Sequence, residues 1–284
     1  MLDTYFFEQQ DGSRIAYKIL ESRKLEDLKN EPPLVLIMGL WATKELFMGL
    51  EEELAKHRKV ILFDNRGMGE SSVLNANDPI SIDLMAQDTI ALVKHLGIKR
   101  FNLLGYSMGG SIALSVALNV PSDLKLEKLI LCAWHYNLAE FDYPKSVQEQ
   151  KDMLMKIFEK GAADYMLEHP DKFDKFVEIA FKIRRPHEIF KRQWEAIKHM
   201  DFVSRFQAIK VPTLIIHGED DEIIPIQQSE LLAREIPKNK FLRIPNVGHS
   251  SEGGRIVRDS GRVSNLKYNN KSLKTIKRKK FLEG

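Results

Sequence analysis

The stretch Leu103-Leu104-Gly105-Tyr106-Ser107-Met108-Gly109-Gly110 decides how this chain folds. It follows an apolar run, and residues 107–119 then carry apolar side chains at helical spacing until Pro121 ends the pattern. The stretch therefore predicts a buried strand, a sharp turn at Ser107 and a helix. Such a turn needs small neighbours, because a Cβ at either flanking glycine would crowd its strained backbone. The alternative is an ordinary Gly-Ser turn without a chemical role.

A serine raised on such a turn is a candidate nucleophile, and two downstream segments offer the partners that it needs. A serine hydroxyl is a poor nucleophile near neutral pH, so it requires a base to take its proton and an acid to orient that base. A strand at 213–217 runs into a Gly-Glu-Asp-Asp loop that contains Asp221, and a strand at 241–244 is followed by His249. The order Ser107, Asp221, His249 is typical of hydrolases with a nucleophile elbow.

Together with two further segments, these motifs resemble the α/β-hydrolase superfamily from about Tyr5 to about Glu252. The further segments are the turn at Met38–Trp41 and the Asp-Asn-Arg-Gly-Met-Gly-Glu-Ser run at 64–71. The resemblance implies an α/β fold with a mostly parallel sheet flanked by helices. It also implies a helical cap, inserted between strands six and seven, and a catalytic role for the serine, aspartate and histidine named above.

The acid and the base each have alternatives. The spacing of the family motif favours Asp221 as the acid, with the adjacent Asp220 as the alternative. The family places its base after the last strand, which favours His249 among the eight histidines. His217, at a strand end, is predicted to be structural. His135, which follows another predicted strand, is either a substrate-binding residue at the mouth of the pocket or a structural histidine.

The oxyanion of an acyl-transfer intermediate needs two backbone N–H donors. The superfamily takes one from the residue after the nucleophile, here Met108, and one from a loop after an earlier strand, here Leu40. That loop usually opens with His-Gly, whereas this chain has Met38-Gly39, so a side chain that usually buttresses the loop is replaced. Trp41 is the alternative donor, or a substrate-binding wall of the pocket.

Three other features are predicted to be structural. The turn at 64–71 carries an Asp and an Arg that hold the loop in the resembling family, and glycines that permit positive φ. Asp83 and Asp88 lie on a helix with an apolar stripe and are expected to be solvated or to cap it. Cys132 lies in a buried-type strand and is expected to be an inert core thiol.

Short apolar strands mostly alternate with helical segments, which indicates a sheet covered on both faces. A hairpin at 5–7 and 14–20 precedes strands at 34–38, 60–63, 101–104, 128–133, 213–217 and 241–244. At about 136–206 strands give way to helical stretches at 147–160, 162–168, 173–181 and 188–200. The superfamily inserts its cap here, so the predicted domain 1–252 includes a lid that shapes the substrate site.

The C-terminal segment departs from the family pattern. Residues 253–284 hold ten Lys or Arg against two Asp or Glu, a net charge of +8, whereas the whole 284-residue chain carries +3. This composition predicts a flexible basic tail in place of the final helix of the family. A diverged or frame-shifted terminus is favoured as the explanation over a segment that binds nucleic acid or anionic lipid. Apart from this basic segment, the sequence carries no strong signal for nucleic-acid binding.

Composition fits a cytoplasmic enzyme. The single cysteine excludes an internal disulfide, and the N-terminus lacks the basic and apolar pattern of a signal peptide. No apolar run approaches the length that spans a membrane. The cytoplasm is therefore the expected compartment.

The expected function is that of a serine hydrolase, which cleaves a small-molecule carboxylic ester, thioester or lactone through an acyl-enzyme. The resemblance implies no metal and no organic cofactor. The alternatives are a binding or receptor protein without catalysis, a C–C hydrolase and a cofactor-free haloperoxidase.

Overall fold

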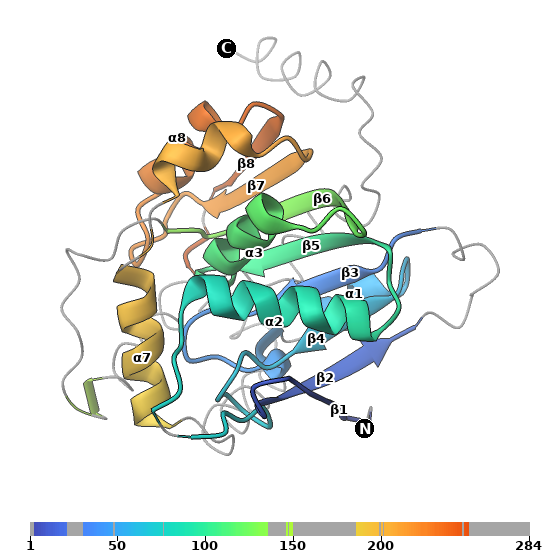
Figure 1. Ribbon diagram of the computed structural model, residues 1–284. Coiled ribbons are helices and arrows are strands. Elements are labelled where there is room, and N and C mark those ends of the chain that lie inside the picture. The colour runs from blue at the N-terminus through green and yellow to red at the C-terminus, as the bar shows by residue number, and fades with distance from the viewer. Residues whose placement is uncertain are drawn as a thin grey trace, which may run out of the picture.

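The computed structural model contains one eight-stranded sheet at its centre (Figure 1), in the order β1-β2-β4-β3-β5-β6-β7-β8. It describes residues 3–21, 31–47, 49–75, 77–135, 146, 148–149, 186–198, 200, 202–245 and 247–249. β1 pairs with β2 and β2 pairs with β4 in the antiparallel sense, and every other pairing in the sheet is parallel. The predicted fold class is confirmed.

The strands lie where the apolar runs predicted them. Their bounds are β1 Tyr5–Glu8, β2 Arg14–Leu20, β3 Leu34–Ile37, β4 Val60–Phe63, β5 Arg100–Tyr106, β6 Lys125–Cys132, β7 Thr213–Gly218 and β8 Asn239–Ile244. β6 begins earlier than predicted, because polar residues pair at its start, where Lys125 lies opposite Arg100. Polar residues at a strand end leave no apolar signal in the sequence.

Helices cover both faces of the sheet, as continuous apolar strands require. Their bounds are α1 Leu50–Ala55, α2 Ile82–His95, α3 Met108–Asn119, α7 His187–Lys198 and α8 Gln227–Glu235, with the 3-10 helices η2 Lys44–Phe47 and η3 Val203–Ala208. Side chains alternate along each strand, so Val35 and Ile37 of β3 enter the core beneath α2 and α3, while Leu34 and Leu36 enter the core beneath α1. The sheet is therefore buried between two apolar layers.

One expectation on α2 is wrong. Asp83 is exposed and accepts a hydrogen bond from Ser115 Oγ, but Asp88 is buried and pairs with Arg66, with 2.5 Å between Oδ1 and Nη2. The helical stripe of the sequence did not reveal this, because the guanidinium that compensates the charge comes from a loop 22 residues earlier. A buried carboxylate needs such a partner.

The predicted cap at about 136–206 lies largely outside the described residues, as does the predicted tail at 253–284. The last part of the cap region is described: the helical stretch predicted at 188–200 corresponds to α7, and η3 follows it. α7 (yellow in Figure 1) buries Ile189, Phe190 and Trp194 in the same core as α2 and α3. α7 thus docks on the core of the sheet domain.

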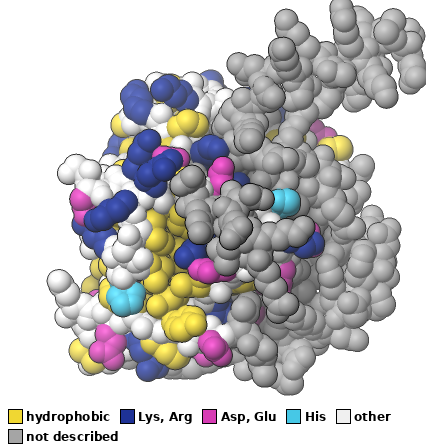
Figure 2. Space-filling model, turned by 90° about the vertical axis from the view of Figure 1, so that its right-hand side faces the viewer, with side chains coloured by type: hydrophobic (Ala, Val, Ile, Leu, Met, Phe, Trp, Pro, Cys, Tyr) yellow, Lys and Arg dark blue, Asp and Glu magenta, His cyan; other side chains and the backbone are white. Residues whose placement is uncertain are grey.

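Charged side chains of both signs are interspersed on the described part of the face in Figure 2, around a strip of hydrophobic side chains. The positive excess of the chain is concentrated instead in residues 253–284. Within the described segments, the helices are all too short or too polar to cross a membrane.

Candidate active site

Ser107 lies at the turn between β5 and α3, in a strained conformation with φ 54° and ψ −122°. A residue other than glycine rarely adopts such a positive φ unless its surroundings force it. A Cβ on Gly105 would lie 2.2 Å from the Gly109 carbonyl oxygen, and a Cβ on Gly109 would lie 2.2 Å from the Ile37 carbonyl oxygen. The main chains of β5, α3 and β3 therefore touch at the two glycines, as the motif predicted.

Ser107, His249 and Asp221 form a continuous hydrogen-bonded chain. His249 Nε2 lies 3.2 Å from Ser107 Oγ, and His249 Nδ1 lies 2.8 Å from Asp221 Oδ2. A carboxylate can only accept, so Nδ1 carries the proton and Nε2 is left to accept from the serine hydroxyl. The three groups follow β5, β8 and β7, whose carboxyl ends share one edge of the sheet. All three residues are buried.

The Asp221 carboxylate is held in its charged form. Burial by itself would raise the pKa of Asp221, but attraction to His249 and hydrogen bonds from His217, His249 and the Ile224 N–H outweigh it, so the pKa falls well below its ordinary value. Oδ1 accepts the N–H groups of Ile223 and Ile224 at 2.9 and 2.8 Å. The neighbouring Asp220 is exposed, so the geometry favours Asp221.

His217 supports the acid loop. Its Nε2 lies 2.9 Å from the Ile224 carbonyl oxygen and 3.1 Å from Asp221 Oδ2, and its Nδ1 lies 2.7 Å from Ser229 Oγ. Because a carbonyl only accepts, Nε2 is the protonated nitrogen and Nδ1 accepts from the hydroxyl. The expectation of a structural histidine agrees with these contacts, although its contact with Asp221 was not predicted. The signal in the sequence was a histidine four residues before the acid.

Tyr106 joins the nucleophile turn to the histidine loop. Its hydroxyl donates to the main-chain carbonyl of His249, and the two rings lie 5.6 Å apart at their centroids. Gly218 lets the same loop approach β7, since a Cβ there would lie 2.1 Å from the Val247 carbonyl oxygen. The sequence offered no sign of the role of Tyr106, because the motif leaves that position open.

The loop after β3 lies against Ser107, where a second oxyanion donor is required. A Cβ on Gly39 would lie 3.0 Å from Ser107 Cβ and 3.5 Å from its Oγ. Within the described part of the chain, the N–H groups of Leu40 and Met108 have no acceptor. The Trp41 N–H, the alternative donor, is already bonded to Gln193 Oε1 at 3.0 Å. Leu40 is therefore the candidate donor of this loop.

The two predicted substrate-binding side chains are both buried. The Trp41 ring packs edge-on against Phe190 of α7, with 5.2 Å between centroids. His135 follows β6, and burial together with repulsion from His249 lowers its pKa to about 3. Its Nδ1 has no hydrogen-bond partner among the described residues. His135 is thus a neutral polar group beside the base.

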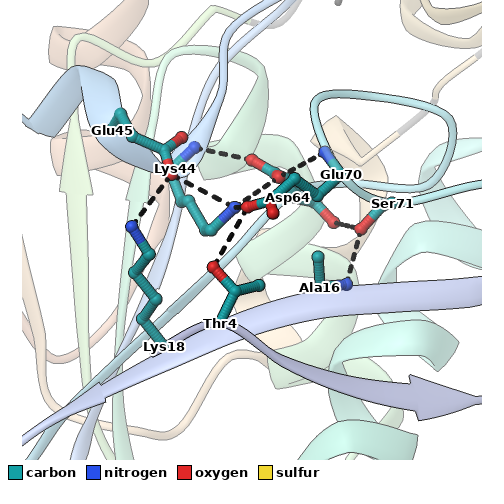
Figure 3. A network of polar contacts seen from close by, with 8 residues as sticks. All are labelled: Thr4, Ala16, Lys18, Lys44, Glu45, Asp64, Glu70 and Ser71. Atoms are coloured by element: carbon teal, nitrogen blue, oxygen red, sulfur yellow. Dashed lines mark hydrogen bonds and ion pairs between the residues drawn. The ribbon is translucent and has the colours of Figure 1, made fainter. Parts of the chain in front are cut away.

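The loop at residues 38–43, which carries the candidate oxyanion donor Leu40, is called the oxyanion loop below, and an ion-pair cluster anchors its far end (Figure 3). Lys44 Nζ lies 2.7 Å from both Asp64 Oδ2 and Glu70 Oε2, and the Lys44 N–H donates to Asp64 Oδ1 at 2.8 Å. Ser71 Oγ donates to the Asp64 carbonyl and accepts from the Ala16 N–H. The turn at 64–71 is structural, as predicted, but the part played by Lys44 was missed because its partners lie 20 and 26 residues away.

The described residues offer neither a metal site nor a reactive thiol. Over the ranges that the structure describes, no group of three or more His, Cys, Asp or Glu side chains is arranged to hold a metal ion. Cys132 is fully enclosed in β6, and burial raises the pKa of its thiol to about 12. It is an inert core thiol, as expected.

Comparison with known proteins identifies the family of the chain. The model of the family described as "alpha/beta hydrolase fold" matches residues 32–174 and 183–251. The chain is 26% identical over 234 residues to the "Putative carbamate hydrolase RutD" of Pseudomonas savastanoi pv. phaseolicola, covering 78% of this chain and 87% of that one. It is 26% identical over 247 residues to the AB hydrolase superfamily protein YisY of Bacillus subtilis, covering 80% and 88%.

Solved structures share the fold. The enol-lactonase from Burkholderia xenovorans LB400 superposes with a TM-score of 0.75 at 23% identity, over 92% of this chain and 97% of that one. A thermophilic esterase from Thermogutta terrifontis superposes with a TM-score of 0.71 at 23% identity, over 93% and 96%. The family model matches well over half of the sequence. The chain belongs to the α/β-hydrolase fold family.

Proposed function

We propose that the chain is a serine hydrolase that cleaves a small carboxylic ester, thioester or lactone. The observation that carries the proposal is the hydrogen-bonded chain from Ser107 Oγ through His249 to Asp221, with distances of 3.2 and 2.8 Å. This is the arrangement that activates a serine hydroxyl. The esterase and enol-lactonase among the structural neighbours support the substrate class, and the sequence relatives named as carbamate hydrolases make carbamates worth testing beside esters.

The acylation step follows from the geometry. Ser107 Oγ attacks the carbonyl carbon while His249 Nε2 takes the hydroxyl proton, and Asp221 stabilises the imidazolium that forms. The carbonyl oxygen becomes an oxyanion, which accepts from the N–H groups of Leu40 and Met108. The intermediate collapses when His249 returns the proton to the leaving oxygen or sulfur. The product of this half-reaction is an ester between Ser107 and the acyl group.

Deacylation repeats these roles with water. His249 takes a proton from water, the resulting hydroxide attacks the acyl carbon, and the second oxyanion occupies the same two N–H donors. Collapse returns the proton to Ser107 Oγ and releases the acid. His135 is buried beside His249 and stays neutral, so of these two histidines His249 is the one that becomes protonated in each half-reaction.

The test compares the wild type with Ser107→Ala in two measurements. The first is turnover of p-nitrophenyl acetate and of a panel of thioesters, lactones and carbamates, and the second is labelling by a fluorophosphonate. Turnover and labelling by the wild type should both be lost in the variant, by orders of magnitude, because removal of the nucleophile disables the whole triad. Equal activity in the variant would refute the proposal. A wild type that neither turns over substrate nor takes the label would instead favour a binding protein on the same fold.

A further inference from the structure

Two side-chain amides hold the oxyanion loop on both sides of its candidate donor. Asn65 Nδ2 donates to the Met38 carbonyl at 3.0 Å, and the Trp41 N–H donates to Gln193 Oε1 at 3.0 Å. The first contact fixes the Met38–Gly39 peptide, and the second fixes the Leu40–Trp41 peptide. The peptide between them, Gly39–Leu40, carries the Leu40 N–H. The direction of that N–H is therefore set by its two clamped neighbours.

Gln193 reaches the loop from a distant part of the chain. It lies on α7, 152 positions from Trp41 in the sequence, and is fully buried with 0% exposure. Only the oxygen of an amide can accept from an N–H, so its Oε1 must face Trp41. The Gln193 Nε2 has no partner among the residues that are described. The polar role that the structure gives this side chain is to accept from the oxyanion loop.

α7 is itself docked firmly enough to act as a support. Phe190 packs on the Trp41 ring, and Ile189 lies so close to Gly67 that a Cβ there would come within 2.6 Å of it. α7 therefore touches both the oxyanion loop and the turn at 64–71 that holds Asn65. Trp41 has a φ of 53°, a conformation that an L-residue adopts only when its surroundings impose it. Gln193 and Phe190 supply part of that constraint.

We propose that Gln193 is a positioning residue, which orients the Leu40 N–H toward the oxyanion by holding the next peptide of the loop. It acts through Leu40 and does not touch the reacting atoms. Formation of the second oxyanion donor then depends on the docking of α7 against the loop after β3. The kinetic part of this inference rests on the proposed hydrolase function, whereas the contact itself does not.

The experiment compares the full-length wild type with Gln193→Met and Gln193→Glu. Gln193→Met retains the volume and removes the acceptor, while Gln193→Glu retains an acceptor oxygen and removes the Nε2 donor. Gln207→Met is the matched control, since Gln207 is an exposed glutamine on η3. Two readouts are measured: kcat and KM on p-nitrophenyl acetate, and amide hydrogen exchange in a peptide that spans Leu40–Thr43.

Gln193→Met should lower kcat by roughly 10- to 100-fold and leave KM within about threefold. The reason is that a misdirected N–H donor stabilises the oxyanion of the transition state less, while substrate binding changes little. Exchange at Trp41 should become faster by at least roughly tenfold, since its N–H loses its acceptor. Gln193→Glu should keep the slow exchange and a higher kcat than Gln193→Met. Gln207→Met should behave as the wild type in both measurements.

A merely structural role would give a different pattern. It would lower the thermal midpoint and change KM, with similar losses in the Met and Glu variants. Should Gln193→Met fail to fold, Gln193→Asn keeps the amide but shortens its reach by one methylene, and the same loss of kcat and of protection is expected. Wild-type kcat, or unchanged exchange at Trp41, in a folded Met or Asn variant would overturn the inference. A wild type without turnover would refute the proposed function, while the exchange measurement would still decide the contact.

Discussion

At the scale of single residues, the site combines one charged group with one neutral group around the base. The Asp221 pKa lies far below its ordinary value, because hydrogen bonds and attraction to His249 overcome the effect of burial. The His135 pKa is lowered to about 3, because burial and His249 both disfavour its charged form. At neutral pH one neighbour of His249 is therefore an anion and the other is uncharged, so an imidazolium formed at His249 is attracted by Asp221 and meets no positive charge at His135.

Replacement of the acid should disable the base without displacing it. We expect Asp221→Asn to lower kcat by about 10³- to 10⁴-fold, because an amide favours the wrong tautomer of the histidine. Asp220→Asn is the control and should change kcat little, since Asp220 is exposed. Steady-state kinetics on a p-nitrophenyl ester decide between them. A larger loss in the Asp220 variant would move the acid by one residue.

The His135 pKa implies a dependence of stability on pH. The folded pKa of about 3 lies below the value of 6.5 that is usual for an exposed histidine, as in the unfolded chain. Between these values the unfolded chain binds a proton that the folded chain does not, so the free energy of unfolding falls as pH drops from about 6.5 toward about 3. At pH 4.5 the loss from this group should be roughly 2 to 3 kcal/mol.

Urea unfolding of the wild type and of His135→Phe, at pH 7 and pH 4.5, checks this dependence. Whatever the absolute stability of the variant, its loss of unfolding free energy between the two pH values should be smaller than that of the wild type by the stated amount. Parallel losses in the two proteins would show that His135 is protonated in the folded chain at pH 4.5.

At the scale of elements, short turns hold the site together with the helix α7. The oxyanion loop is tied at its far end by Lys44 to Asp64 and Glu70. Burial by itself would lower the Lys44 pKa, but attraction to Asp64 and Glu45 and hydrogen bonds to Asp64 and Glu70 raise it instead. Lys44 therefore stays charged inside the protein, and the turn at 64–71 is bound to it.

Loss of the lysine should be costly for folding. Lys44→Met leaves the buried Asp64 carboxylate without its cation, which should lower the free energy of unfolding by about 3 to 5 kcal/mol. Lys56→Met is the matched control, because its pair with Glu53 is exposed and should contribute at most about 1 kcal/mol. Urea unfolding measures both variants. Equal effects would mean that the Lys44 cluster adds no more than a surface pair.

Elements with a local signal could be predicted, whereas contacts between distant elements could not. The strands and the turn at Ser107 follow from apolar runs and glycines, which act within a few residues. The placement of Asp88, Lys44, Tyr106 and Gln193 depends on partners that are remote in the chain, and a single sequence carries no trace of such pairings. Ser107, Asp221 and His249 could be predicted because each lies in a local motif and the three follow a known order. The contacts of Asn65 and Gln193 with the oxyanion loop have no such motif.

At the scale of the whole molecule, the basic C-terminal segment remains a prediction from composition. The ten Lys and Arg of residues 253–284 repel one another, and the segment offers few apolar side chains to bury. We expect truncation after Glu252 to leave the proposed hydrolase activity within about twofold of that of the full chain. Limited proteolysis with trypsin should cut first between Arg255 and Lys280 and leave an active core. Loss of activity on trimming would show that the segment supports the His249 loop.

The sheet order also has a consequence for biosynthesis. His249, the candidate base, lies 142 positions after Ser107 and follows β8, which among the described strands pairs only with β7. A ribosome delivers Ser107 long before it delivers His249, and the domain begins to fold from its N-terminal side. Until the last strand joins the edge of the sheet, the serine has no proton acceptor. In a nascent or prematurely terminated chain the Ser107 hydroxyl therefore lacks its base, and it becomes a nucleophile only after the sheet is complete.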